Sequence, residues 1–182
     1  MFHLYGLFIG IAIVVGYSVA ERLDERVGKI APWVIGLGLI GARIYHVIDK
    51  WGYYSQNLIQ IPAVWNGGLA IWGGIIGGLA AFEIINHKFA NSQIDKWNIL
   101  GAIVTALPLA QAIGRLGNAV NGEFYDIVWT MPWWAVEAIL DLILFGILIN
   151  LKKVSPQVKV LIYLAGYSLI RLVLNPFRID LR

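Results

Sequence analysis

Six long apolar segments, separated by short polar loops, are the feature that most constrains the fold of this chain. They cover roughly residues 3–20, 30–49, 67–86, 97–113, 132–150 and 159–175. Each has about 17–20 residues, which at about 1.5 Å per residue lets an α-helix cross the hydrocarbon core of a membrane. Because 59% of the chain is apolar and only 14% is charged, it cannot supply the polar surface of a soluble domain. The sequence therefore predicts an all-α, polytopic membrane helical bundle with about six transmembrane helices.

Basic residues are unevenly distributed over the loops, and this distribution indicates how the chain crosses the membrane. The loops at 21–29, 87–96 and 151–159 hold eight of the fourteen lysines and arginines. Cytoplasmic loops carry such an excess, so we expect these loops in the cytoplasm and the N-terminus on the extracytoplasmic side. The net charge is +3, but the lysines and arginines are scattered between apolar runs. This distribution is typical of a protein in a lipid bilayer, and we expect no nucleic-acid partner. No linker or repeat divides the chain, so residues 1–182 are predicted to form a single domain.

Cysteine is absent, and the three histidines lack the spacing of metal ligands. This chain therefore cannot form a disulfide or use a cysteine nucleophile of its own. We expect neither a metal nor another cofactor.

Three arginines lie inside the predicted spans, where a charged side chain raises the free energy of membrane insertion by about 2.5–3.5 kcal/mol. With the orientation above, Arg43, Arg115 and Arg171 all fall in the outer part of their segments, at the depth of Tyr5 and His46. One interpretation is that each arginine extends its charged end to the outer head groups. The shared depth instead favours a cationic site for a phospholipid phosphate, to which a guanidinium offers a planar fork of donors.

Two glycine-rich segments lie near this depth. Residues 112–123 contain three glycines, which predict irregular backbone that lines a cavity; an ordinary outer loop is the alternative. Residues 65–78 contain six glycines, and the pairs 73/77 and 74/78 predict close packing against a neighbouring helix. Gly67 and Gly68 are also expected to leave space for a lipid head group.

The same segments carry a resemblance to a known family. The chain resembles the prolipoprotein diacylglyceryl transferases of bacterial inner membranes. The family's signature block is matched by Gly114 to Asn118 together with Asn121 to Glu123. The family's second glycine-rich block is similar to Trp65 to Gly78. More modest matches, in the family's order, are Tyr5-Gly6, Gly41-Ala42-Arg43, Glu137, Tyr167, Arg171 and Arg178. The resemblance thus covers nearly the whole chain.

The resemblance implies a reaction, a membrane and a set of residues. Such enzymes transfer the diacylglyceryl group of phosphatidylglycerol to the lipobox cysteine thiol in the signal-peptide region of a preprolipoprotein, leaving glycerol phosphate and using no metal. It also implies the inner membrane, with the active site toward the extracytoplasmic face. Together with the polar residues above, the expected catalytic residues are Arg115, Asn118, Glu123, Arg171, Tyr5 and His46. The expected substrate-binding residues are Arg43, Arg115, Asn121, Gly67, Gly68 and Arg178.

The chain departs from the family pattern at three positions. Trp72 stands where the family often has a histidine that is a proposed base, Asn175 where it has a glutamate, and Asp126 where a glycine is usual. The base that deprotonates the thiol is therefore left open between Glu123 and His46, with His3 as a further candidate. Glu137 is expected to orient an arginine. The alternative functions are a catalytically inactive relative that binds lipid or lipoprotein, and a small membrane transporter.

Overall fold

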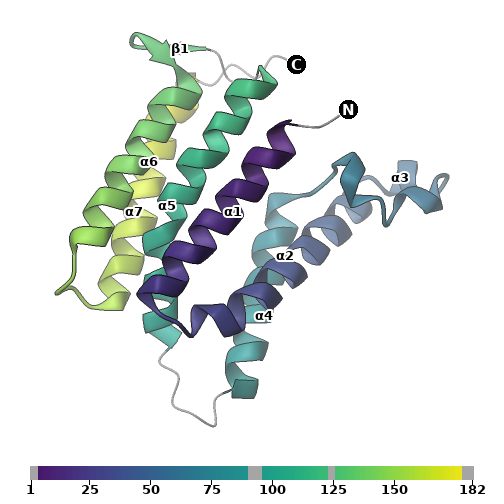
Figure 1. The fold of residues 1–182 in the computed structure, drawn as a ribbon. Coiled ribbons are helices and arrows are strands. Elements are labelled where there is room, and N and C mark those ends of the chain that lie inside the picture. The colour runs from purple at the N-terminus through teal and green to yellow at the C-terminus, as the bar shows by residue number, and fades with distance from the viewer. Residues whose placement is uncertain (1–3, 90–95, 123–125, 178–182) are drawn as a thin grey trace. The chain divides into compact units, whose positions relative to one another are not determined.

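The computed structural model describes residues 4–89, 96–122 and 126–177, and these are almost entirely helical (Figure 1). The α-helices are α1 (Leu4–Leu23), α2 (Val27–Asp49), α3 (Trp51–Tyr54), α4 (Ile71–Phe89), α5 (Lys96–Asn121), α6 (Trp133–Asn150) and α7 (Pro156–Leu174). Short 3-10 turns cover Leu58–Gln60, Val64–Asn66 and Asn175–Phe177. A small antiparallel hairpin pairs β1 (Ile127–Val128) with β2 (Met131–Pro132). The prediction of an all-α fold is confirmed.

Five helices in the described residues are long and apolar enough to cross a membrane: α1, α2, α5, α6 and the region Pro156–Phe177 that contains α7. The remaining predicted span, 67–86, corresponds to α4, whose apolar part is the shorter Ile71–Ile85. Gly67 and Gly68 explain the difference, because their φ angles of 82° and 74° turn the chain before the helix begins. The protein is thus a polytopic helical membrane protein.

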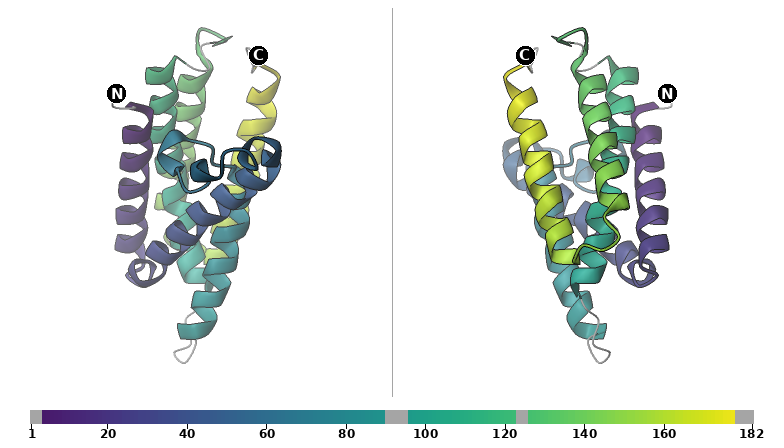
Figure 2. Two further views of the ribbon diagram at one scale, coloured as in Figure 1. Left: turned by 90° about the vertical axis from the view of Figure 1, so that its right-hand side faces the viewer. Right: turned by 90° about the vertical axis from the view of Figure 1, so that its left-hand side faces the viewer.

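The chain forms two compact units, and the first comprises residues 1–27 and 95–182. Its central helix is α5, which packs against α1, α6 and α7, while α6 and α7 also pack against each other. These helices lie side by side in Figures 1 and 2. The end with Tyr5, Gly117 and Trp133 is called the site end, and the end with Gly101 and Pro156 is called the basic end.

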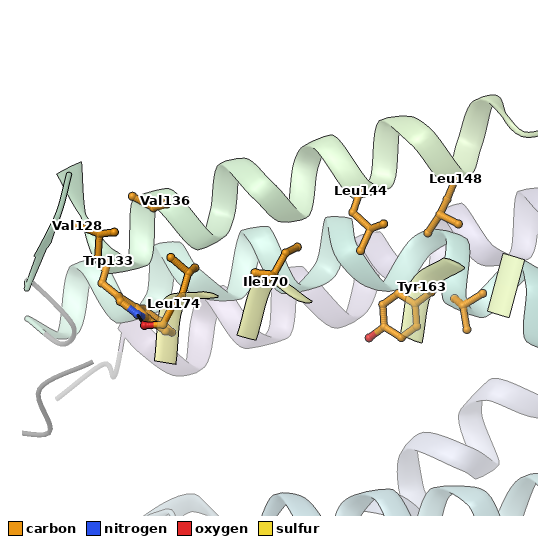
Figure 3. Close-up of a cluster of buried hydrophobic side chains, with 9 residues drawn as sticks. Val128, Trp133, Val136, Leu144, Leu148, Tyr163, Ile170 and Leu174 are labelled. Carbon is orange, nitrogen blue, oxygen red and sulfur yellow. Dashed lines mark hydrogen bonds between the residues drawn. The ribbon is translucent and has the colours of Figure 1, made fainter. Parts of the chain in front are cut away.

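An apolar core joins α6 to α7 and positions the residues of the site end. Trp133, Leu148 and Leu174 are fully buried, and Figure 3 shows the core side chains in a row along these helices. The Trp133 indole nitrogen donates a hydrogen bond of 2.8 Å to the Leu174 carbonyl. This bond ties the beginning of α6 to the end of α7.

The second unit, residues 28–94, is held by glycines between α2 and α4. A Cβ atom on Gly41 would lie 2.5 Å from the Gly73 carbonyl oxygen, and one on Gly77 would lie 2.7 Å from that of Leu37. Only glycine allows the two backbones to approach this closely. The packing predicted for Gly73 and Gly77 is confirmed. The prediction that residues 1–182 act as a single domain stays a prediction.

The irregular backbone predicted for residues 112–123 is wrong as far as Asn121, because α5 continues without a break to that residue. Only Gly122 adopts a positive φ, of 72°. Gly117 instead serves helix packing: a Cβ atom there would lie 3.1 Å from the Tyr5 ring and 3.2 Å from the Phe8 Cβ. The polar residues of this block therefore lie on a regular helix, against which α1 packs closely.

Candidate active site

One buried carboxylate joins two arginines at the site end of the first unit. Glu137 of α6 is fully buried, and its Oε2 lies 2.9 Å from the Arg115 Nε. Its Oε1 accepts a hydrogen bond of 3.0 Å from the Arg115 Nη2 and another of 3.3 Å from the Arg171 Nη1. We call these three residues the arginine cluster. The expectation that Glu137 orients an arginine is confirmed, and it applies to two arginines.

An aromatic ring lies against both guanidinium groups. The Cζ atoms of Arg115 and Arg171 each lie 5.5 Å from the centre of the Trp133 ring, which is within the range of cation–π attraction. Trp133 and Glu137 share a face of α6 because they are four residues apart. The two arginine side chains stay 20% and 30% exposed. Since a guanidinium carries five N–H donors, this pair can also bind an anionic ligand.

Two further predicted residues lie at the same end. The Arg115 Nη1 donates a hydrogen bond of 3.1 Å to the Asn118 Oδ1, and Asn118 is itself buried. Tyr5 packs on Gly117, one residue before Asn118. The structure therefore brings Arg115, Asn118, Arg171 and Tyr5 to one end of the first unit, as predicted.

Further polar groups, none of which was assigned a catalytic or binding role from the sequence, continue from the cluster toward the middle of this unit. Asp141, one turn after Glu137 on α6, is fully buried, and within the described residues neither of its carboxyl oxygens has a hydrogen-bond partner. The Gln111 Nε2 donates a hydrogen bond of 3.1 Å to the Tyr163 hydroxyl, and the Tyr163 ring stacks on that of Tyr167. The four-residue spacing of Glu137 and Asp141 is the signal that could have identified Asp141.

In the second unit, Arg43 holds a loop together. It is only 7% exposed, and all three of its side-chain nitrogens donate to backbone carbonyl oxygens of the loop between α3 and α4. The acceptors are Gln60 (2.5 Å), Ile61 (2.8 Å), Ala63 (3.3 Å), Gly67 (2.6 Å) and Gly68 (2.9 Å). These bonds support a role for Arg43 in shaping the loop, and the predicted contact with a phosphate stays a prediction.

Gly68 brings this loop against two predicted side chains. A Cβ atom on Gly68 would lie 2.7 Å from the Arg43 Nη1 and 2.7 Å from the His46 Nε2, so a larger residue would displace these side chains and would also be strained at the Gly68 φ of 74°. The His46 ring meets the Tyr54 ring edge-on, with 5.9 Å between the ring centres. The structure thus brings Arg43, His46, Gly67 and Gly68 together within the second unit.

Similarity in sequence to known proteins identifies the family of this chain. A family model described as prolipoprotein diacylglyceryl transferase matches residues 1–182. The chain belongs to the prolipoprotein diacylglyceryl transferase family. It is 36% identical to the phosphatidylglycerol–prolipoprotein diacylglyceryl transferase of Clostridioides difficile, over 97% of this chain and 78% of that protein. It is 32% identical to the enzyme of the same name from Finegoldia magna, over 97% of this chain and 79% of that protein. It is 29% identical to the one from Synechocystis, over 97% of this chain and 74% of that protein.

The positions that depart from the pattern of the diacylglyceryl transferase family lie in different surroundings. Trp72, in the first turn of α4, is 64% exposed. The Asn175 backbone N–H donates to the Arg171 carbonyl at the end of α7. The Asp126 carbonyl accepts a hydrogen bond of 2.8 Å from the Trp133 backbone N–H. Asn175 and Asp126 therefore both contact the backbone of residues that form or flank the arginine cluster.

The remaining predicted residues of this family member lie at the exposed end of α5 or outside the described part of the chain. Asn121 is exposed at the end of α5. Glu123, Arg178 and His3 lie outside the described residues.

Proposed function

We propose that this family member transfers the diacylglyceryl group of phosphatidylglycerol to the lipobox cysteine thiol of a preprolipoprotein and so forms a thioether. The arginine cluster is the observation that carries the proposal. Two guanidinium groups share the single carboxylate of Glu137, so one positive charge is not compensated by that carboxylate. This suits the single negative charge of a phosphodiester, and the names of the relatives supply the two substrates.

In the proposed step, the substrate thiolate attacks the glyceryl carbon that carries the phosphate oxygen. The C–S bond forms as the C–O bond breaks, and the electron pair of the C–O bond stays on the oxygen, which leaves in glycerol phosphate. The leaving phosphate gains negative charge, which N–H donors of Arg115 and Arg171 stabilise in the transition state. Asn118 orients Arg115. A base, Glu123 or His46, takes the thiol proton.

We assign the remaining predicted residues to binding. Arg43 shapes the loop that contains Gly67 and Gly68. Nothing lies within 4 Å of a Cβ atom placed on Gly67, which leaves space there for the lipid head group, and Asn121 and Arg178 bind substrate. Tyr5 completes the site end beside Asn118. These roles rest on the resemblance in sequence and on the contacts described above. Both units are proposed to act as one transferase domain.

We place the protein in the bacterial inner membrane with the site end toward the extracytoplasmic face. Two of the basic loops, 21–29 and 151–159, meet at the basic end of the first unit, where Leu23, Arg26, Lys152 and Lys159 line one cavity. Loops rich in Lys and Arg remain in the cytoplasm, which leaves the arginine cluster near the opposite face.

A transfer assay tests the proposal. Purified protein is incubated with phosphatidylglycerol and a lipobox peptide, and the peptide is analysed by mass spectrometry. We expect one diacylglyceryl mass to be added to the cysteine and glycerol phosphate to be released. Lipid binding without a change in peptide mass would indicate an inactive relative, and solute flux into liposomes would indicate a transporter.

A further inference from the structure

A second polar site lies at the basic end of the first unit. A cavity of about 460 Å³ opens there between the end of α1 and the beginnings of α5 and α7. Gly101, which lines it, precedes Arg115 on α5 by three to four turns, or about 21 Å at 1.5 Å per residue. The cavity is therefore separate from the arginine cluster, and the transfer reaction does not use it.

Positive charge predominates in the lining of this cavity. Its acidic side chain, Asp24, is paired with Arg26, which donates at 2.8 Å through Nε and at 2.6 Å through Nη2. This pair leaves Lys152 and Lys159, which also line the cavity and form no ion pair within the described part of the chain. The cavity thus carries two positive charges that no carboxylate of residues 4–89, 96–122 or 126–177 compensates.

Helix termini add to this potential. The first turns of α5 and α7 contribute Asn98 and Pro156 to the lining. The Ser155 side chain at the N-cap of α7 makes no capping hydrogen bond. The backbone N–H groups and the partial positive charge at the N-terminus of a helix both favour an anion.

An apolar side chain of the lining indicates which anion fits. Leu23, at the end of α1, lines the cavity and is 43% exposed. An acyl chain can lie along this side chain while a phosphate enters the cavity, whereas a free phosphate would leave it unused. Basic pockets between transmembrane helices at the cytoplasmic side bind anionic head groups in this way.

We infer that this cavity binds the phosphate of an anionic phospholipid in the leaflet at the basic end, through Lys152, Lys159 and the N-terminus of α7. The site is additional to the one that binds the transferred lipid. It couples the first unit to the lipid composition of the leaflet opposite the arginine cluster.

Native mass spectrometry of the full-length protein in detergent, titrated with phosphatidic acid, tests this inference. We compare the double variant K152Q/K159Q with K29Q/K153Q, which removes the same charge from two lysines that do not line the cavity. At about 1 kcal/mol per lysine, K152Q/K159Q should bind one phosphatidic acid about thirtyfold more weakly. The single variant K152Q, at an exposed position, should show about a fivefold loss, while K29Q/K153Q should match the unsubstituted protein.

The controls distinguish the source of the phosphate and the site of binding. Phosphatidylcholine should not occupy the cavity, and millimolar inorganic phosphate should compete only weakly with phosphatidic acid. Equal loss in the two double variants would overturn the cavity as the site. Full displacement by inorganic phosphate would overturn a lipid ligand in favour of a free phosphate compound. Because transfer is not measured, the result does not depend on the proposed reaction.

Discussion

Arginines within the helices of this protein serve two purposes that depend on their partners. Arg43 donates five hydrogen bonds to backbone carbonyls of one loop, so its guanidinium is committed to the protein. Arg115 and Arg171 instead share Glu137 and the face of Trp133. Their combined charge exceeds that of the carboxylate, which makes this pair the better candidate for binding a phosphate.

Replacement of Arg115 by alanine tests that assignment. We expect Arg115→Ala to lower the rate of diacylglyceryl transfer at least about a hundredfold, because it removes donors that stabilise charge on the leaving phosphate. Thermal unfolding should show that the variant still folds. Arg22→Ala, at an exposed position near the other end of α1, is the control and should keep the full rate. An active Arg115→Ala enzyme would remove Arg115 from the reaction.

Two buried carboxylates one turn apart allow a matched comparison. Glu137→Gln should lower the free energy of unfolding by about 3 kcal/mol, the lower end of the range for a broken buried ion pair, because it leaves two half-buried guanidinium groups without their counter-charge. Asp141→Asn should cost less than about 1 kcal/mol, because within the described residues its oxygens accept no hydrogen bond that would be lost. Thermal unfolding in detergent measures both. Equal losses would mean that burial, and not contact with the arginines, determines the effect.

The residues of the site were predictable to different degrees. Arg115 and Arg171 stand out in the sequence because a charge within an apolar span needs a reason. Arg43 has the same signal, yet its partners are carbonyl oxygens of a loop, and backbone atoms leave no pattern in the sequence. The spacing of Asp141 from Glu137 places both on one helix face, but it assigns Asp141 no role, because a carboxylate without a hydrogen-bond partner in the described residues belongs to no motif.

At the scale of helices, α2 and α4 depend on glycine for their packing. Gly41→Ala should lower the free energy of unfolding by about 1–3 kcal/mol, because the new methyl group would overlap the Gly73 carbonyl oxygen and force the backbones apart. Gly36→Ala, on the same helix with nothing within 4 Å of the new methyl group, is the control. It should be neutral or stabilising by up to about 1 kcal/mol. Chemical denaturation compares the two, and equal effects would contradict close packing at Gly41.

The turn between α1 and α2 should make stability depend on pH. The Arg26 side chain donates hydrogen bonds to the Asp24 carboxylate and holds the pKa of Asp24 below its usual 3.8. A lowered folded-state pKa gives stability that is present above the unfolded pKa and is lost as the pH falls through the folded value. Asp24→Asn should therefore unfold at a lower temperature than the unsubstituted protein near pH 6, and the difference should shrink below about pH 4. Glu25→Gln, at the exposed neighbouring position, should show no such convergence.

The helices themselves follow from the hydrophobic pattern, while their ends do not. Apolar runs predict spans because burial of apolar side chains in lipid dominates the free energy of insertion. The fourth predicted segment ends at residue 113, yet α5 continues to Asn121, because a helix satisfies the backbone hydrogen bonds of polar residues equally well. By contrast, the predicted segment that begins at residue 67 is shorter at its start in the structure. Gly67 and Gly68 have positive φ angles, and α4 begins only at Ile71.

The orientation of the whole molecule decides whether the arginine cluster can meet a lipobox cysteine outside the cytoplasm. The unsubstituted chain has no cysteine, so single cysteines can be placed at exposed positions near either end of the first unit. We expect Thr130→Cys, in the hairpin at the site end, to react with a membrane-impermeant maleimide in intact spheroplasts. Ser155→Cys, at the basic end, should react only after the membrane is disrupted, because the loops rich in lysine and arginine remain inside. The unsubstituted protein controls for background, and the opposite labelling pattern would place the arginine cluster on the cytoplasmic side, where it could not modify a translocated lipobox.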